Sequence, residues 1–361
     1  MLAGPYSGML LADLGADVIK IEPREGDISR QVGPHFVGPH NVYFSSLNRN
    51  KKSVQIDLAT AKGQGELGRL AATAHALVVN MRPETIRKCG LDYASLRRWN
   101  EKIVCVALTG FGLEGSAAGR PAFDYVIQAL TGVAAVTGDP DGPPTLAGYS
   151  AVDNSSGIMA AVGLLAKIIE GKGGQVDVSL HDTMLSQLNY KAAAYLNAAE
   201  RPERMPMGAH LYYVPAQLFQ TRDGHLAMFI THDRFWTRFA TEVGRPEWCS
   251  DERFASMQAR RENRELVVGE ISTLLRKGDS KHWVDRLAPH GIVIAEVNSL
   301  AEALDGTIVR EREMVASIET EHGTIRGIAC PIRFGDSRPS YARPPLLGEH
   351  TDELLHEDGC E

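Results

Sequence analysis

One carboxylate, Asp124, interrupts an apolar run in the stretch between residues 119 and 132. It follows the turn signal Gly119-Arg120-Pro121, and the apolar residues after it recur at helical spacing as far as Gly132. A carboxylate at a helix start meets backbone N–H groups and the positive end of the helix dipole, so the pattern favours an N-cap. The alternative is a nucleophilic carboxylate at the mouth of a cleft. This stretch alone leaves both roles open.

Short buried strands alternate with helices in the part of the chain that must position Asp124. Such alternation predicts a parallel sheet with both faces covered, and ligands bind at the carboxyl ends of its strands. The loops that begin at Pro23, Asn80 and Thr109 lie at these ends, and Asp124 follows the third loop. The expected strands are 18–22, 53–58, 76–79, 103–108 and 175–180; the expected helices are 9–15, 61–74, 85–89, 93–100, 153–167 and 181–196; residues 23–52 are expected to form a long loop.

The pattern changes after a linker rich in Arg, Pro and Met near residues 200–207. Two strand-like runs, 216–221 and 225–230, are joined by Arg222-Asp223-Gly224, which is a strong hairpin signal. This segment is expected to form a separate α+β domain. Its expected helices are 234–243, 262–276 and 281–289, followed by a helix at 300–305, strands at 323–328 and 332–334, and a last helix capped by Thr351.

Composition narrows the functional classes. A chain of 361 residues predicts two domains, and a net charge of −7 without a long basic block argues against general nucleic-acid binding. The five scattered cysteines, with no ligand spacing, indicate free thiols in a reducing cytoplasm and no structural zinc. The start of the chain lacks a basic signal-peptide region, and no apolar run reaches the length of a membrane span. The phosphate-binding glycine fingerprint of dinucleotide dehydrogenases is also missing.

Six blocks follow one another along the chain, at residues 2–22, 48–58, 80–90, 110–112, 119–132 and 345–354. Their sequences, order and spacing resemble those of the family III coenzyme A transferases, the CaiB/BaiF family. The resemblance covers nearly the whole chain and implies a Rossmann-like large domain built from both chain ends, a smaller α+β domain, and an interlocked homodimer. We expect residues 1–197 and 310–361 to form the large, CoA-binding domain, residues 205–300 the small domain, and residues 198–204 and 301–309 the linkers.

The resemblance implies that Asp124 is the nucleophile of a CoA-transferase, which moves CoA from an acyl-CoA donor to a carboxylic acid through an aspartyl-CoA thioester. No tightly bound cofactor is implied, because CoA is itself a substrate. The alternative within the family is an acyl-CoA racemase of the alpha-methylacyl-CoA type, which uses a His before the Asp. Phe123 stands there and cannot transfer a proton. Asp153, the second acidic residue, is expected to cap a helix or to orient a neighbour. A third possibility is a catalytically silent CoA-binding protein.

The resemblance also implies a set of CoA contacts. Lys88 is the expected partner of the 3′-phosphate, with help from Arg24; for both, a solvated loop charge is the alternative. Formyl-CoA:oxalate transferases have a Gln where Leu2 stands here. They also have a run of glycines in the small domain, and only Gly208 stands in the corresponding region of this chain, so oxalate or formyl specificity is not expected. The implied CoA contacts are Ala3, Arg24, Ile56, Asp57, Asn80, Met81 and Lys88.

Met1 falls directly before the first block, where family members usually carry a further strand that is central in the sheet. We therefore expect that the natural protein begins upstream. The alternative is a rearranged sheet whose neighbouring strands close the gap.

Overall fold

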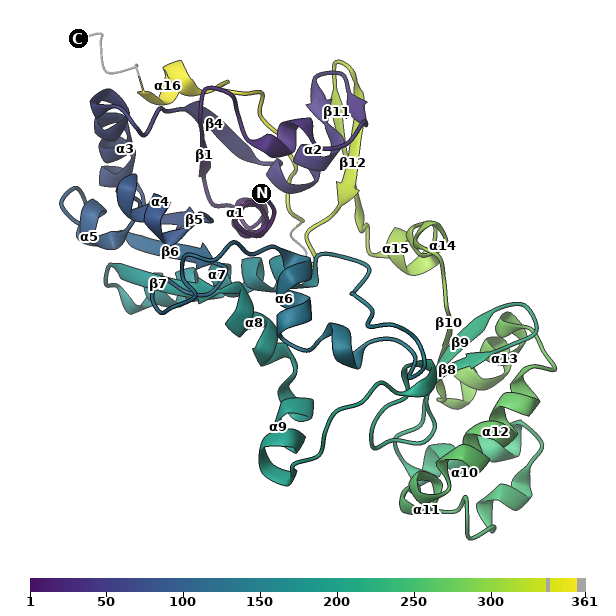
Figure 1. The fold of residues 1–361 in the computed structure, drawn as a ribbon. Helices are drawn as coiled ribbons and strands as arrows, with labels where there is room; N and C mark the ends of the chain where they lie inside the picture. Colours follow the sequence, from purple (N-terminus) through teal and green to yellow (C-terminus); the bar gives the residue numbers. More distant parts are fainter. Residues whose placement is uncertain (336–337, 356–361) are drawn as a thin grey trace. The chain divides into compact units, whose positions relative to one another are not determined.

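The computed structural model describes residues 1–335 and 338–355 (Figure 1). The chain forms two compact units. Unit 1 contains residues 1–131, 147–190 and 306–361, and unit 2 contains residues 132–146 and 191–305. These bounds differ from the expected domains mainly at residues 132–146, which join unit 2. The backbone N–H of Met207 donates to Asp139 Oδ1 at 3.1 Å, so this loop is held by the chain of the second unit.

Two separate parallel sheets form the centre of unit 1 in the part of the chain that is described. Strand β1 (Val18–Glu22) pairs with β4 (Lys51–Gln55), and β6 (Val104–Thr109) lies between β5 (Ala76–Val79) and β7 (Gly174–Ser179). The mixed α/β class with parallel strands is thus confirmed, whereas a single continuous sheet is not found. Neither is a rearranged sheet, because β1 and β5 do not pair with each other in the described strands.

Helix α7 (Ala151–Glu170) is the longest helix of unit 1, and it packs against β6, β7 and α1 (Ala3–Asp13). A Cβ added at Gly157 would lie 2.7 Å from the carbonyl oxygen of Ala3, so only glycine permits the close approach of α1 to α7. The other helices beside these sheets are α3 (Ala61–Thr73), α4 (Pro83–Lys88), α5 (Tyr93–Leu96) and α8 (Leu180–Gln187). The single helix expected at 181–196 is replaced by α8 and α9 (Asn189–Ala198), and most of α9 belongs to unit 2.

Residues 23–52 are not the long loop that their polar composition predicted. They contain the short strands β2 (Phe36–Val37) and β3 (His40–Asn41) and the helix α2 (Val42–Asn48). Asn41 caps α2, because its side chain accepts the backbone N–H of Phe44, whose ring is buried. Strand β4 begins two residues earlier and ends three residues earlier than the expected 53–58, because its pairing with β1 starts at Lys51 and stops at Gln55. The buried ammonium of Lys51 is bonded to three oxygens.

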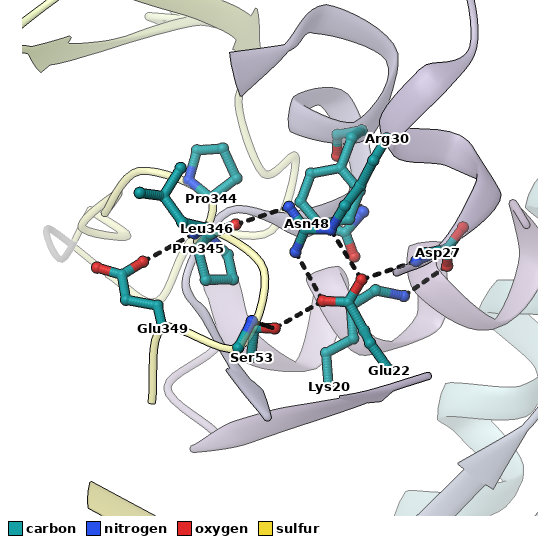
Figure 2. A network of polar contacts seen from close by, with 12 residues as sticks. Lys20, Glu22, Asp27, Arg30, Asn48, Ser53, Pro344, Pro345, Leu346 and Glu349 are labelled. Carbon is teal, nitrogen blue, oxygen red and sulfur yellow. Dashed lines mark hydrogen bonds and ion pairs between the residues drawn. The ribbon is translucent and has the colours of Figure 1, made fainter. Parts of the chain in front are cut away.

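A polar network joins the two ends of the chain in unit 1 (Figure 2). The buried Glu22 carboxylate accepts hydrogen bonds from the guanidinium of Arg30 and from the hydroxyl of Ser53. Ser53 Oγ in turn accepts the backbone N–H of Gly348, and the backbone N–H of His350 donates to Ser53 O. Burial alone would raise the pKa of Glu22, but these hydrogen bonds outweigh it and lower the pKa. The C-terminal segment therefore lies along β4.

The hairpin of β11 (Val315–Thr320) and β12 (Gly323–Ile328) also belongs to unit 1. Arg49 anchors it by donating to Ile328 O at 2.6 Å while pairing with the buried Asp13 carboxylate. The strand expected at 332–334 does not form, since only residue 334 makes a bridge. Three further helices are short: α14 (Leu300–Leu304), which belongs to unit 2, and α15 (Thr307–Glu311) and α16 (Thr351–Leu355) in unit 1. Thr351 is the first residue of α16 rather than its cap.

Unit 2 is an α+β unit, as its hairpin signal predicted. Strands β8 (Ala216–Gln220), β9 (His225–Phe229) and β10 (Val293–Glu296) form an antiparallel sheet with β9 in the middle. The core beside this sheet contains stacked Trp236, Trp248 and Phe254. Its helices are α10 (Asp233–Glu242), α11 (Met257–Glu262), α12 (Arg264–Leu275) and α13 (Ser280–Leu287).

The composition led to expectations about membrane-spanning runs, cysteines and metal ligands, which can be compared with the structure. We expected no apolar run of membrane-spanning length, whereas by length and composition α7 could cross a membrane; in the structure it packs on a sheet and on α8. Cys89, Cys105, Cys249 and Cys330 are free thiols, and Cys360 lies outside the described residues. Among the described residues, no group of three His, Cys, Asp or Glu side chains could hold a metal ion.

Candidate active site

Asp124 is the first residue of α6 (Asp124–Leu130), and its side chain is buried, with the residue 6% exposed. Phe123, not Asp124, occupies the N-cap position of this helix. Asp124 Oδ2 instead accepts the backbone N–H groups of Val152 at 2.8 Å and Asp153 at 3.1 Å, in the first turn of α7. The expectation that Asp124 caps its own helix is therefore wrong, because the side chain caps a neighbouring helix.

The start of α7 explains this arrangement. The first N–H groups of a helix have no partner within the helix, and the Ser150 side chain at the N-cap forms no capping hydrogen bond within the described residues. Asp124 takes that role from a different helix. The α7 dipole places partial positive charge at this end, which stabilises the carboxylate.

Gln128, one turn after Asp124, completes the environment of the carboxylate. Its amide nitrogen donates to Asp124 Oδ1 at 2.5 Å, and its amide oxygen accepts the backbone N–H of Ala147 at 2.8 Å. Gln128 is 0% exposed. Gln128 was not predicted from the sequence; a polar amide four residues after Asp124, on the buried side of an apolar helix, is the signal that could have found it.

The loop after β6 brings Asp124 to the carboxyl end of the sheet. A Cβ added at Gly110 would lie 2.5 Å from the side chain of Ala122, so the chain before Asp124 passes against the residue that follows the strand. Thr109 Oγ1 accepts the N–H of Gly112 and holds the turn between them. The expected position of Asp124 beside the end of the third loop agrees with this contact.

Asp153 lies beside Asp124, and its pKa is shifted by this environment. Burial, and then the negative charge of Asp124, raises the pKa of Asp153 from 3.8 to about 6. The amino group of Met1 opposes this shift. Two carboxyl groups with different environments thus share the start of α7. Phe123, by contrast, is 69% exposed and has no group that could exchange a proton with either.

The expected CoA contacts gather mostly along the carboxyl ends of the parallel strands. Arg24 follows β1, Asp57 follows β4 and Met81 follows β5, and all three are exposed. Lys88 is exposed at the end of α4, and Ala3 is fully buried at the start of α1. The structure thus leaves the charged candidates accessible to a ligand.

Two further candidates have their side chains engaged by the protein. Ile56 is buried in a core cluster with Val54 and Leu355, so only its backbone could face a ligand. The amide of Asn80 donates to Leu108 O at 2.7 Å, which ties β5 to the end of β6. Both side chains therefore have structural roles.

Comparison with known proteins identifies the family. The sequence model of CoA-transferase family III matches residues 1–351. The chain belongs to CoA-transferase family III. It is similar to the succinate–glutarate CoA-transferase of Agrobacterium fabrum (34% identity; 99% of this chain and 92% of the relative) and to the succinyl-CoA:mesaconate CoA-transferase of Haloarcula hispanica (34%; 99% and 93%). A CaiB/BaiF family protein from Brucella suis has a similar crystal structure, with a TM-score of 0.85 at 32% identity, covering 99% of this chain and 95% of that one.

The protein is therefore an enzyme that transfers CoA to a carboxylic acid, as the resemblance implied. The geometry around Asp124 is compatible with that chemistry. A carboxylate can serve as both nucleophile and leaving group, and backbone N–H groups are suited to stabilise an oxyanion on the same carboxyl group.

Proposed function

We propose that this family III transferase works through a covalent aspartyl-CoA thioester on Asp124. One observation carries the proposal: a buried carboxylate beside the carboxyl end of a parallel sheet, held by two backbone N–H groups of α7. In each tetrahedral intermediate at the Asp124 carbonyl, negative charge develops on the oxygen that these donors contact.

The proposed steps balance without ATP or a metal. Asp124 attacks the thioester carbonyl of the donor, and CoA thiolate leaves, giving a mixed anhydride. The thiolate then attacks the Asp124 carbonyl carbon and expels the donor acid, which carries away one Asp124 oxygen. The acceptor carboxylate next displaces the thiolate from Asp124, and the released thiolate attacks the acceptor carbonyl. The products are the new acyl-CoA and a carboxylate on Asp124 that contains one acceptor oxygen.

We infer that CoA binds along the carboxyl ends of β1, β4 and β5, with Lys88 and Arg24 as the phosphate partners. Their exposure supports this assignment, as does the position of the other candidates in the loops after the strands. The donor and acceptor are proposed to be small dicarboxylic acids, with succinyl-CoA as the donor. The names of the two transferases given above support this choice.

Trapping and isotope transfer test the proposal. The protein is incubated with succinyl-CoA and then with hydroxylamine or an acid quench, and the peptide containing Asp124 is analysed by mass spectrometry. We expect a CoA or hydroxamate adduct on Asp124. With glutarate labelled by 18O in its carboxyl groups, one turnover should leave one heavy oxygen on Asp124. Alpha-proton exchange of a branched acyl-CoA without any adduct would instead favour the racemase.

We also propose a homodimer. The exposed apolar side chains of Ile158, Val162 and Ile169 on α7, together with Tyr125 and Leu130 on α6, support this proposal, because exposed apolar surface often marks a protein interface. Light scattering at micromolar concentration should give twice the chain mass; a monomer mass would contradict it. A cytoplasmic location stays a proposal, supported by the free cysteines.

A further inference from the structure

Gln128 makes the two oxygens of Asp124 unequal. A carboxylate offers about four acceptor positions, two on each oxygen. Oδ2 accepts two backbone N–H groups from α7, whereas Oδ1 accepts only the Gln128 amide among the described residues. One acceptor position is therefore left, and it belongs to Oδ1. This is the lone pair that can attack a carbonyl carbon.

The Gln128 side chain is itself held at both ends. Its amide oxygen accepts the N–H of Ala147, so the nitrogen must point toward Asp124. The group is fully buried, and a turned amide would set its oxygen against the carboxylate and its nitrogen against the N–H of Ala147. The orientation of Gln128 thus fixes the rotation of the Asp124 carboxylate about its own bond.

We propose that Gln128 is a positioning residue for CoA transfer: it holds Asp124 so that Oδ1 attacks the acyl-CoA while Oδ2 stays on the N–H groups of Val152 and Asp153. The inference rests on the proposed aspartyl intermediate. In the first step a bond forms between Oδ1 and the donor carbonyl carbon, and the bond from that carbon to sulfur breaks, with both electrons leaving on CoA thiolate. Oδ2 becomes the carbonyl oxygen, so it carries the negative charge when the thiolate attacks Asp124. No proton moves to or from Gln128.

Two substitutions that nearly preserve the size of Gln128 distinguish a positioning role from a simple packing role. Gln128→Met keeps the bulk and loses both hydrogen bonds. Because misplaced reacting groups can cost about 100-fold in rate, we expect kcat to fall about 10–100-fold while KM for acyl-CoA changes less than about threefold. Gln128→Glu can donate a hydrogen bond to Oδ1 only when its carboxyl is protonated, and its other oxygen can still accept from Ala147.

The pH profile of Gln128→Glu is therefore the decisive readout. When the new carboxyl ionises, two negative groups face each other in a buried site and Oδ1 loses its donor. The ratio of kcat of this variant to that of the wild type should approach one at the acid end. It should fall by up to tenfold per pH unit above the pKa of the introduced group.

The titratable groups on the helices packed against α6 are present in both proteins, so their effects largely cancel in this ratio. They are Asp153, Lys167 and Glu170 on α7, and His181 with Asp182 on α8.

Gln175 supplies the matched control. Its amide at the amino end of β7 also bridges the backbone, donating to Cys105 O at 2.8 Å and accepting from Tyr93 N at 3.0 Å, away from Asp124. Gln175→Glu and Gln175→Met should leave kcat and its pH profile unchanged. Circular dichroism and thermal melts check that every variant is folded.

The outcomes are distinct. A Gln128→Glu ratio that falls with pH, together with a slow Gln128→Met, supports the inference. A pH-independent ratio in folded protein, or Gln128→Met with more than half of the wild-type kcat, overturns it while leaving Asp124 as the nucleophile. A wild-type enzyme that transfers CoA without any adduct or isotope on Asp124 overturns the proposed intermediate itself, and the positioning role with it.

Discussion

The Asp124 carboxylate accepts the backbone N–H of Val152 at 2.8 Å, so one side chain at the start of α6 caps the helix α7. The same group is the proposed nucleophile. The same carboxylate therefore contributes to the stability of the fold and to the proposed catalysis, and a substitution that removes it changes both. Variants of Asp124 must be chosen so that the two effects can be separated.

Asp124→Ala should abolish CoA transfer, because the loss of a nucleophile costs several orders of magnitude in rate. It should also destabilise the fold by about 0.5–2 kcal/mol, since α7 loses its cap. CoA binding should be largely retained, because none of the expected CoA contacts depends on this side chain. Steady-state rates, urea unfolding and CoA titration measure the three quantities.

Asp124→Asn is the matched control for this experiment. Its side-chain oxygen can still accept the N–H groups of α7, whereas its amide nitrogen would face the Gln128 nitrogen, so we expect no transfer and only part of the wild-type stability. Turnover above a few per cent in either purified variant would contradict the nucleophile.

Asp153→Asn should stabilise the protein at neutral pH. The pKa of Asp153 is raised from 3.8 to about 6, so the folded state binds this proton more tightly than the unfolded state. Stability is therefore lost as the pH rises between these values, and Asn avoids that loss. Each pKa unit corresponds to about 1.4 kcal/mol, so we expect a gain of about 1–3 kcal/mol at pH 7. Denaturant unfolding should show this gain vanishing below pH 4; a gain that persists there would contradict the titration.

Gly157→Ala should destabilise the protein although alanine is the better helix former. The added methyl group would meet the Ala3 carbonyl oxygen at 2.7 Å and force α1 away from α7. Gly269→Ala is the control, since nothing lies within 4 Å of its Cβ in α12, and it should stabilise by about 0.5–1 kcal/mol. Thermal melts of the two variants should move in opposite directions; a shared direction would show that the α1–α7 contact is not tight.

Arg49→Ala should destabilise the protein by about 3–5 kcal/mol, because it removes the charged partner of the buried Asp13 carboxylate and leaves it only the amide of Asn50 among the described residues. It also removes the hydrogen bond to Ile328 O in β12. Lys281→Ala breaks the exposed ion pair with Asp285 and should cause no measurable change. Unfolding in guanidinium chloride compares the two variants, and similar midpoints would argue against a structural role of the buried pair.

The amino-acid sequence alone determined the class of the fold and the family. The alternation of apolar runs with turn signals is local, so it predicted β1, β5 and β6 close to their observed bounds and the hairpin of β8 and β9. The motifs around Asp124 are also local, and they indicated a CoA-transferase. The polar region that contains α2 was misassigned, because Phe44 is buried by contacts with other segments, with the Arg30 guanidinium over its ring.

Tertiary structure decided how Asp124 is held. Its donors come from Val152 and Asp153, 28 and 29 residues away in the chain, and no local pattern links a carboxylate to the uncapped end of another helix. Gln128 is close to Asp124 in the sequence, but its role depends on the N–H of Ala147, which fixes the orientation of its amide. Hydrogen bonds depend on distance and direction in space, and only the folded chain brings these donors to the two oxygens of one carboxylate.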